Sequence, residues 1–199
     1  MQREDWDERY AEPTLLWSAT PNRFLVREAE DLRPGRALDL ACGEGRNALW
    51  LAELGWHVTA VDFSSVAIGK ARERATRARA DIDFVCADLL EYEPETASYE
   101  LVVLLYLQLP AEERRLVLAR AAAALAPGGT FLLVGHDLLN LTEGVGGPRD
   151  PRVLYTPDDI VAELPGLEIE KAERVPRDVE DADRPAIDAL VRARREARA

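Results

Sequence analysis

Short apolar runs alternate along the chain with longer stretches in which apolar residues recur at helical spacing. The short runs predict five strands, at residues 37–41, 57–61, 82–87, 99–105 and 130–134. The longer stretches predict helices at residues 24–32, 48–54, 65–79 and 110–125, the last of them stopped by Pro-Gly-Gly at 127–129. Strands that alternate with helices indicate an α/β fold built on a parallel sheet.

The last quarter of the chain breaks this alternation. A helix is expected to start after Thr156, because a capping threonine, a proline at the first position and Asp159 three residues later form a typical helix start, and to run to Leu164. Residues 167–175 and 186–193 then predict two strands with no helix between them, which indicates an antiparallel pair. We therefore expect a three-layer α/β sandwich around a seven-stranded, mostly parallel sheet with an antiparallel last strand.

A glycine turn, Cys42-Gly-Glu-Gly45, joins the first predicted strand to the helix that follows. Strand, glycine turn and helix open many nucleotide-binding units, because the turn is tight and the free N–H groups of the helix face the ligand. Residues 43–48 also fit the dinucleotide fingerprint, which is weak evidence by itself. Asp39 distinguishes between a dinucleotide and a cationic ligand. A carboxylate just before the glycines would repel the phosphates of a dinucleotide, whereas it would attract a cationic ligand.

These residues carry a family resemblance. Residues 38–45 (Leu-Asp-Leu-Ala-Cys-Gly-Glu-Gly) and 57–64 (His-Val-Thr-Ala-Val-Asp-Phe-Ser) resemble the first two motifs of Rossmann-like (class I) S-adenosylmethionine-dependent methyltransferases. The resemblance extends from Trp6 to about Arg195 and is nearest to small-molecule enzymes of the tellurite-resistance type. The family usually has glycine where this chain has Ala41. The methyl group of the alanine leaves less room for the amino-acid part of the cofactor.

The resemblance implies one domain over residues 1–199 that binds S-adenosylmethionine and releases S-adenosylhomocysteine. Residues 1–32 would form an N-terminal lid, 36–137 the cofactor-binding core, and 138–199 the acceptor-side loop, helix and strand pair. In the lid, Arg9 would meet the cofactor's carboxylate, while Tyr10 and Trp17 would shield its sulfonium. An amphipathic cover over the sheet edge is the alternative role of this segment.

Two acids follow predicted strands where the cofactor's sugar and base would lie. Asp62 stands close to the roughly 20-residue spacing at which an acid meets ribose hydroxyls, although helix capping is an alternative. Asp88 would accept a hydrogen bond from the adenine amino group, or else start a turn. The complete set of expected cofactor contacts is Arg9, Tyr10, Trp17, Asp39, Ala41, Gly43, Gly45, Asn47, Asp62, Phe63, Ala87, Asp88, Leu89 and Leu105.

The acceptor is expected at the carboxyl ends of the fourth and fifth strands, where open α/β sheets bind their ligands. Tyr106, Gln108 and His136 leave those ends, and the long connection 138–154 would wall the pocket with help from Asn140, Thr142 and Tyr155. His136 is the candidate for acid–base catalysis, with a structural or pocket-lining role equally open. No metal is predicted, because the chain has two histidines and no CxxC pair.

The length, charge and composition of the chain exclude some kinds of partner. The chain has 199 residues and a formal net charge of −12, which argues against a nucleic acid substrate. No apolar run reaches the roughly 18 residues of a membrane span, and the polar start predicts no signal peptide, so we expect a cytoplasmic protein with two reduced cysteines. The basic stretch 192–198 is expected to be a solvated terminus.

The predicted function is therefore methyl transfer from S-adenosylmethionine to a small molecule by in-line displacement. A cofactor-binding sensor or assembly partner without turnover is one alternative, and a nicotinamide-dependent enzyme is another. The sequence does not distinguish a monomer from a homodimer, and it leaves the acceptor open.

Overall fold

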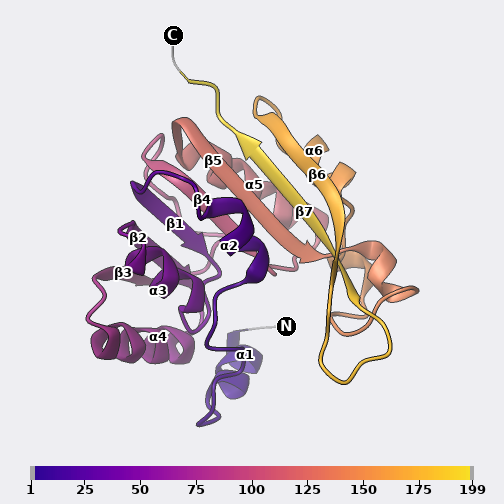
Figure 1. Cartoon of the computed structure of the whole chain (residues 1–199), viewed down its shortest axis with the longest axis horizontal. Coiled ribbons are helices and arrows are strands. Elements are labelled where there is room, and N and C mark those ends of the chain that lie inside the picture. Colours follow the sequence, from indigo (N-terminus) through magenta and orange to yellow (C-terminus); the bar gives the residue numbers. More distant parts are fainter. Residues whose placement is uncertain (1–2, 198–199) are drawn as a thin grey trace. The chain divides into compact units, whose positions relative to one another are not determined.

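The computed structural model of the protein describes residues 3–197 (Figure 1). These residues divide into two compact units. Unit 1 comprises the chain up to Glu93 together with Tyr99–Val103, and unit 2 comprises Pro94–Ser98 and the chain from Leu104 onward. The outer ends of the predicted single domain, residues 1–2 and 198–199, lie outside the described residues. Within the described chain, no helix has both the length and the apolar character needed to cross a membrane.

Unit 1 is built on three parallel strands. Its elements are α1 (Arg3–Tyr10), α2 (Arg23–Ala29), β1 (Arg36–Leu40), α3 (Arg46–Glu53), β2 (His57–Asp62), α4 (Ser65–Ala78), β3 (Ile82–Cys86) and the larger part of β4 (Tyr99–Leu105). Strand β2 pairs in parallel with β1 on one side and with β3 on the other. Helix α3 packs on β1 and β2, and α4 packs on β2 and β3, burying apolar side chains such as Leu51 and Ile68 completely.

Unit 2 contains the antiparallel part of the fold. It holds the end of β4, α5 (Ala111–Ala124), β5 (Leu125–His136), η1 (Leu138–Leu141), η2 (Pro151–Val153), α6 (Pro157–Ala162), β6 (Glu168–Arg177) and β7 (Ala186–Arg194). Strand β7 lies between β5 and β6 and is antiparallel to both (Figure 1). Thr156 caps α6 in the predicted capping box with Asp159.

The seven strands form one sheet in the order β3-β2-β1-β4-β5-β7-β6. This arrangement confirms the predicted α/β fold, with a seven-stranded, mostly parallel sheet and a reversed last strand.

The prediction for residues 125–130 was wrong. Helix α5 ends at Ala124, and β5 begins at Leu125, so Pro127-Gly-Gly129 lies inside the strand and does not follow a helix. Backbone N–H groups of Ala97 and Ser98 bond the last carbonyls of the helix, at Ala123 and Ala124. Because Gly128 N and Gly129 O also bond the backbone of Arg195, the segment extends the β5–β7 pairing. Helices α2 and α6 likewise end earlier than predicted, at Ala29 and Ala162.

The basic residues near the C-terminus are also not a solvated tail. Arg192 and Arg194 belong to β7, and Arg192 Nε pairs with Glu170 Oε2 at 2.8 Å. Arg195 donates from its guanidinium to Leu125 O at 2.7 Å, capping the end of α5. Arg198, the end of the predicted tail, lies outside the described residues.

Candidate cofactor and acceptor site

The glycine turn of unit 1 has the left-handed backbone that its sequence favours. Gly43 and Gly45 have φ values of +54° and +77°, and Ala41 joins them at +60°. A Cβ on Gly43 would lie 3.0 Å from Tyr10 Oη, and one on Gly45 would lie 3.0 Å from the Cβ of Ala71 on α4. Gly43 therefore leaves room beside the aromatic residues of the N-terminal segment, while Gly45 permits close helix packing.

Asp39 lies at the end of β1 with its carboxyl group buried. The residue is 1% exposed, and neither carboxylate oxygen has a hydrogen-bond partner of normal geometry in residues 3–197. Burial, and then the charge of Asp62, raise the pKa of Asp39 to about 7, against the opposing effects of Arg46 and the Ala48 N–H. A buried carboxyl without partners is costly, and a cationic ligand would relieve that cost.

Asp62 closes the same turn from β2. Its Oδ2 accepts from Gly43 N at 2.8 Å, and its Oδ1 accepts from Ser64 N at 2.9 Å. Burial raises its pKa, and these two backbone bonds oppose the shift. Ser64, not Asp62, caps α4 by accepting from Ala67 N. Each oxygen of Asp62 keeps a second lone pair, so the carboxylate remains able to accept from a diol.

Aromatic residues of the N-terminal segment gather next to the glycine turn. Tyr10 is 5% exposed, and its hydroxyl accepts from Trp17 Nε1 at 3.3 Å. Trp6 stacks on Tyr10 with 5.6 Å between ring centroids, and the guanidinium carbon of Arg9 lies 4.5 Å from the Trp6 ring centroid. The three residues predicted for the lid, Arg9, Tyr10 and Trp17, are thus brought together in one cluster.

Two residues that the sequence did not single out fasten this segment. Glu44, buried within the glycine turn, accepts from Leu16 N at 2.9 Å and pairs with Lys70 Nζ of α4 at 3.1 Å. Lys70 Nζ also donates to the carbonyls of Glu12 and Thr14, at 2.6 and 3.0 Å. Helix α1 is fixed separately, because Asp7 accepts from the Ser64 hydroxyl at the start of α4.

The remaining predicted cofactor contacts have structural partners of their own. Asn47 Oδ1 accepts from Asn22 N at 2.9 Å, and Asp88 Oδ1 accepts from Leu90 N at 2.9 Å in a local turn. Ala87 N donates to Asp62 O at 3.0 Å, which holds this turn beside the end of β2. Phe63 is partly exposed, while Leu89 and Leu105 are buried, the last of these in unit 2.

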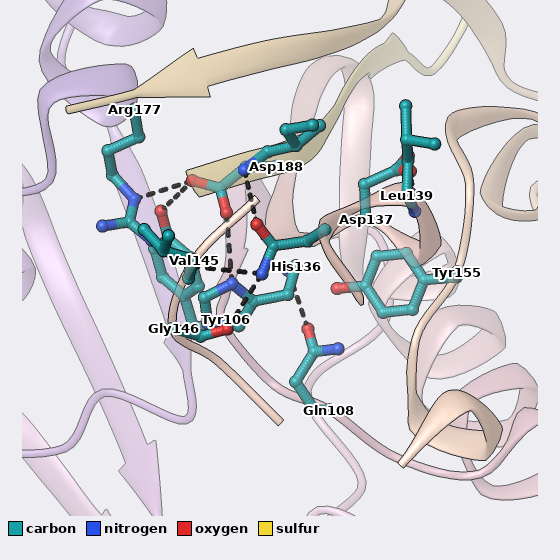
Figure 2. Close-up of polar contacts among 12 residues, drawn as sticks. Tyr106, Gln108, His136, Asp137, Leu139, Val145, Gly146, Tyr155, Arg177 and Asp188 are labelled. Atoms are coloured by element: carbon teal, nitrogen blue, oxygen red, sulfur yellow. Dashed lines mark hydrogen bonds and ion pairs between the residues drawn. The ribbon is translucent and has the colours of Figure 1, made fainter. Parts of the chain in front are cut away.

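In unit 2, three polar side chains converge on Asp188 (Figure 2). Asp188 Oδ2 accepts from Tyr106 Oη and from Arg177 Nε, each at 2.7 Å, and Oδ1 lies 3.3 Å from His136 Nδ1. Asp188 is fully buried, and His136 lies directly opposite it in the β5–β7 register. Sequence patterns gave no sign of Asp188 or Arg177, because their role depends on this register.

The other predicted acceptor contacts of unit 2 differ in exposure. Gln108 is partly buried and bridges Val153 O and His136 N, at 2.8 and 3.1 Å. Asn140 is 1% exposed and holds the 144–147 loop through the carbonyls of Val145 and Gly146. Tyr155 is 1% exposed, with its hydroxyl 3.4 Å from Leu107 O. Thr142 is exposed at the end of η1.

A cavity of about 290 Å³ lies beside this loop in unit 2, lined by residues 144–147, Leu141, Arg149 and Arg184. Among the described residues, no group of three or more His, Cys, Asp and Glu side chains is arranged to hold a metal ion.

Comparison with known proteins agrees with this geometry. Residues 37–129 match the family model described as "Methyltransferase domain". The chain is 35% identical over 120 residues to Hemagglutinin 1 of Eikenella corrodens, covering 58% of this chain and 39% of that protein. It spans between about a third and about half of the length of the curated relatives it matches.

Solved structures share the fold over nearly the whole chain. The N-methyltransferase NodS from Bradyrhizobium japonicum WM9, crystallised with S-adenosylhomocysteine, has a TM-score of 0.76 at 19% identity, and the match covers 97% of each chain. TehB from Haemophilus influenzae has a TM-score of 0.73 at 20% identity, covering 98% of this chain and 68% of that one. At such identities the likeness establishes the fold.

The fold and the glycine turn thus define a Rossmann-like α/β protein. The matched region adds one likeness of sequence to this fold, because residues 37–129 are similar to a methyltransferase domain.

Proposed function

We propose that this protein binds S-adenosylmethionine through unit 1 and transfers its methyl group to a small-molecule acceptor, releasing S-adenosylhomocysteine. The observation that carries the proposal is the buried carboxyl group of Asp39 next to the glycine turn, which has no hydrogen-bond partner of normal geometry among the described residues. A carboxyl with no internal partner suits a ligand with a cationic amino-acid end, and it disfavours the phosphates of a nicotinamide dinucleotide.

The residues of unit 1 fit the rest of the cofactor. The left-handed turn at Gly43 has no Cβ at its closest point, Asp62 keeps lone pairs for ribose hydroxyls, and Asp88 starts the turn expected at the adenine. Arg9, Tyr10 and Trp17 supply a guanidinium and aromatic faces for the methionine end, where cation–π contact contributes roughly 0.5–2 kcal/mol. When bound, the cofactor supplies an electrophilic methyl group on a sulfonium.

The protein's own contribution is positioning and the exclusion of water. Unit 1 would hold the methyl donor. The residues predicted from sequence to contact the acceptor, Tyr106, Gln108 and His136, are partly exposed. The negative net charge supports a small molecule over a nucleic acid as acceptor. A cytoplasmic location and a monomeric or dimeric state stay predictions.

The test is methyl transfer from tritiated S-adenosylmethionine to a panel of small phenols, thiols, carboxylates and heterocycles. We expect labelled product and S-adenosylhomocysteine from at least one acceptor class. Asp39→Asn should lose most of this turnover, whereas Asp83→Asn, a matched change on the exposed face of β3, should not. Cofactor binding without product across the whole panel would favour a sensor or assembly partner instead.

A further inference from the structure

The small cavity of unit 2 has no role in the proposed function. It has a volume of about 290 Å³ and is lined by the loop that follows η1 and by the connection from β6 to β7. The loop contributes residues 144–147 and Arg149, and the connection contributes Arg184. All of the lining residues belong to unit 2, so the shape of the cavity depends on that unit alone.

The charged side chains that line this cavity are two arginines, Arg149 and Arg184. Arg149 Nη1 lies 3.5 Å from Leu141 O, and Arg184 Nη1 lies 3.3 Å from Thr142 O, so both guanidinium groups reach the same turn of chain at the end of η1. Neither arginine forms an ion pair with an acid in residues 3–197. Each guanidinium has five N–H donors, and most of them remain available to a ligand.

A buried asparagine fixes the loop beside these arginines. Asn140 is 1% exposed, and its Nδ2 donates to Val145 O at 3.3 Å and to Gly146 O at 2.9 Å. Its Oδ1 accepts from Ile187 N of β7 at 2.7 Å, which ties the loop to the sheet. The fit is close, because a Cβ on Gly144 would collide with the Asn140 side chain. The loop therefore has a defined shape before any ligand binds.

The same bonds determine where two backbone N–H groups of the loop point. The described peptide bonds are all trans, and in a trans peptide unit the N–H points opposite to the C=O. Because the carbonyls of Val145 and Gly146 face Asn140, the N–H groups of Gly146 and Gly147 point away from it. Neither N–H has an acceptor within residues 3–197. Successive N–H groups in turns form concavities that bind anions.

We propose that this cavity binds the phosphate group of a small phosphorylated molecule. The guanidinium groups of Arg149 and Arg184 would hold the phosphate oxygens together with the N–H groups of Gly146 and Gly147. The site lies in unit 2 alone, and the proposal does not depend on the binding of S-adenosylmethionine.

The number and kind of donors favour a phosphate over a carboxylate. A phosphate monoester carries a charge of about −1.5 to −2 at pH 7 and three strong acceptor oxygens, which matches two guanidinium groups and two N–H groups. A carboxylate brings one charge and two oxygens. The volume is near the lower end of the roughly 300–1,000 Å³ of small-molecule pockets. The net charge of −12 argues against a nucleic acid as the source of the phosphate.

Calorimetric titration of the full chain at pH 8 tests the charge preference. The probes are phenyl phosphate, benzoate and phenol, which differ in the charge they carry beside one aromatic ring. We expect phenyl phosphate to bind at one site per chain, benzoate to bind more weakly and phenol not to bind. Absence of phenyl phosphate binding would overturn the proposal, and so would a benzoate affinity equal to that of phenyl phosphate.

The arginines are tested by exposed substitutions that leave the core of unit 2 intact. Arg149→Gln and Arg184→Gln should each weaken phenyl phosphate binding by roughly 10-fold, since each removes a charged donor. Arg115→Gln is the matched control, because Arg115 is an exposed arginine of α5 outside the cavity and its loss changes the net charge equally. Equal affinities in the wild type and both cavity variants would overturn the proposal.

NMR of protein labelled with ¹⁵N in its 12 glycines locates the bound phosphate. Phenyl phosphate should shift the amide signals of Gly146 and Gly147 and leave those of Gly43 and Gly45 in unit 1 unchanged. Shifts at Gly43 and Gly45, with Gly146 and Gly147 unmoved, would place the phosphate at the glycine turn of unit 1 and overturn the proposal.

Discussion

Asp39 keeps its carboxyl group in the interior of unit 1 with a pKa raised to about 7 by burial and by Asp62. Between the pKa of the unfolded chain, near 4, and about 7, the folded protein binds the additional proton, so its stability falls as pH rises through that window. We expect Asp39→Asn to be more stable than wild type at pH 8, by about 1–3 kcal/mol, and to differ little at pH 5. Thermal unfolding at both pH values measures this.

A stability difference between wild type and Asp39→Asn that does not change with pH would contradict the raised pKa. Asp83→Asn, on the exposed face of β3, is the control for a general effect of charge. Asp62, whose pKa is also raised, gives both proteins a pH dependence of the same sign.

Ala41 occupies a left-handed backbone position, with φ +60°, where the resembling family has glycine. This conformation costs an alanine roughly 1–2 kcal/mol. We expect Ala41→Gly to stabilise the fold by about 1 kcal/mol, a rise in Tm of about 2–4 °C. Ala52→Gly, in helix α3, should lower Tm instead. A Tm that falls in both variants would show that the turn does not strain Ala41.

Sequence patterns predicted the residues whose role is local and missed those whose partners are distant. Gly43 and Gly45 stand in the motif at residues 38–45 and Asp62 in the motif at residues 57–64, so their turn could be foreseen. Glu44 and Lys70 could not be paired from sequence, because they meet only when α4 packs beside the glycine turn. Asp188 faces His136 only through the β5–β7 register, which no short motif encodes.

The N-terminal segment is fastened to the rest of unit 1 at Lys70, which bonds Glu44 and two carbonyls of the segment. We expect Lys70→Met to loosen residues 11–17 and to speed amide exchange at Leu16, whose N–H donates to Glu44, by about 10-fold for each ~1.4 kcal/mol lost. Hydrogen exchange followed by mass spectrometry over residues 11–20 measures this change.

Arg77→Met is the matched control, because it removes an exposed pair with Glu73 on the same helix. Unchanged exchange over residues 11–20 in Lys70→Met would mean that the aromatic cluster and Asp7 hold the segment without the Lys70–Glu44 pair.

The ends of helices could be predicted from sequence where a strong local capping pattern marks them. The capping box at Thr156 placed the start of α6 correctly. The prediction from Pro127-Gly-Gly129 was wrong, because such residues usually end a helix. Here the backbone of Arg195 continues the strand pairing as far as Gly129. Tertiary hydrogen bonds, which no local pattern shows, thus place Gly128 and Gly129 in the strand pairing.

The whole sheet could be predicted because its alternation is regular until the last two strands. A pair of strands without an intervening helix admits an antiparallel arrangement, and β6 and β7 adopt it. The formal net charge of −12 and the unpartnered Asp39 then point to the same kind of partner, a small ligand with a cationic end.

Calorimetric titration of the purified protein with S-adenosylhomocysteine, and separately with NADH, tests the cofactor assignment most directly. We expect S-adenosylhomocysteine to bind at one site per chain, with affinity sharply reduced in Asp39→Asn, and NADH to give no heat of binding. Binding of NADH without S-adenosylhomocysteine would contradict the assignment and leave the buried carboxyl of Asp39 as a structural group.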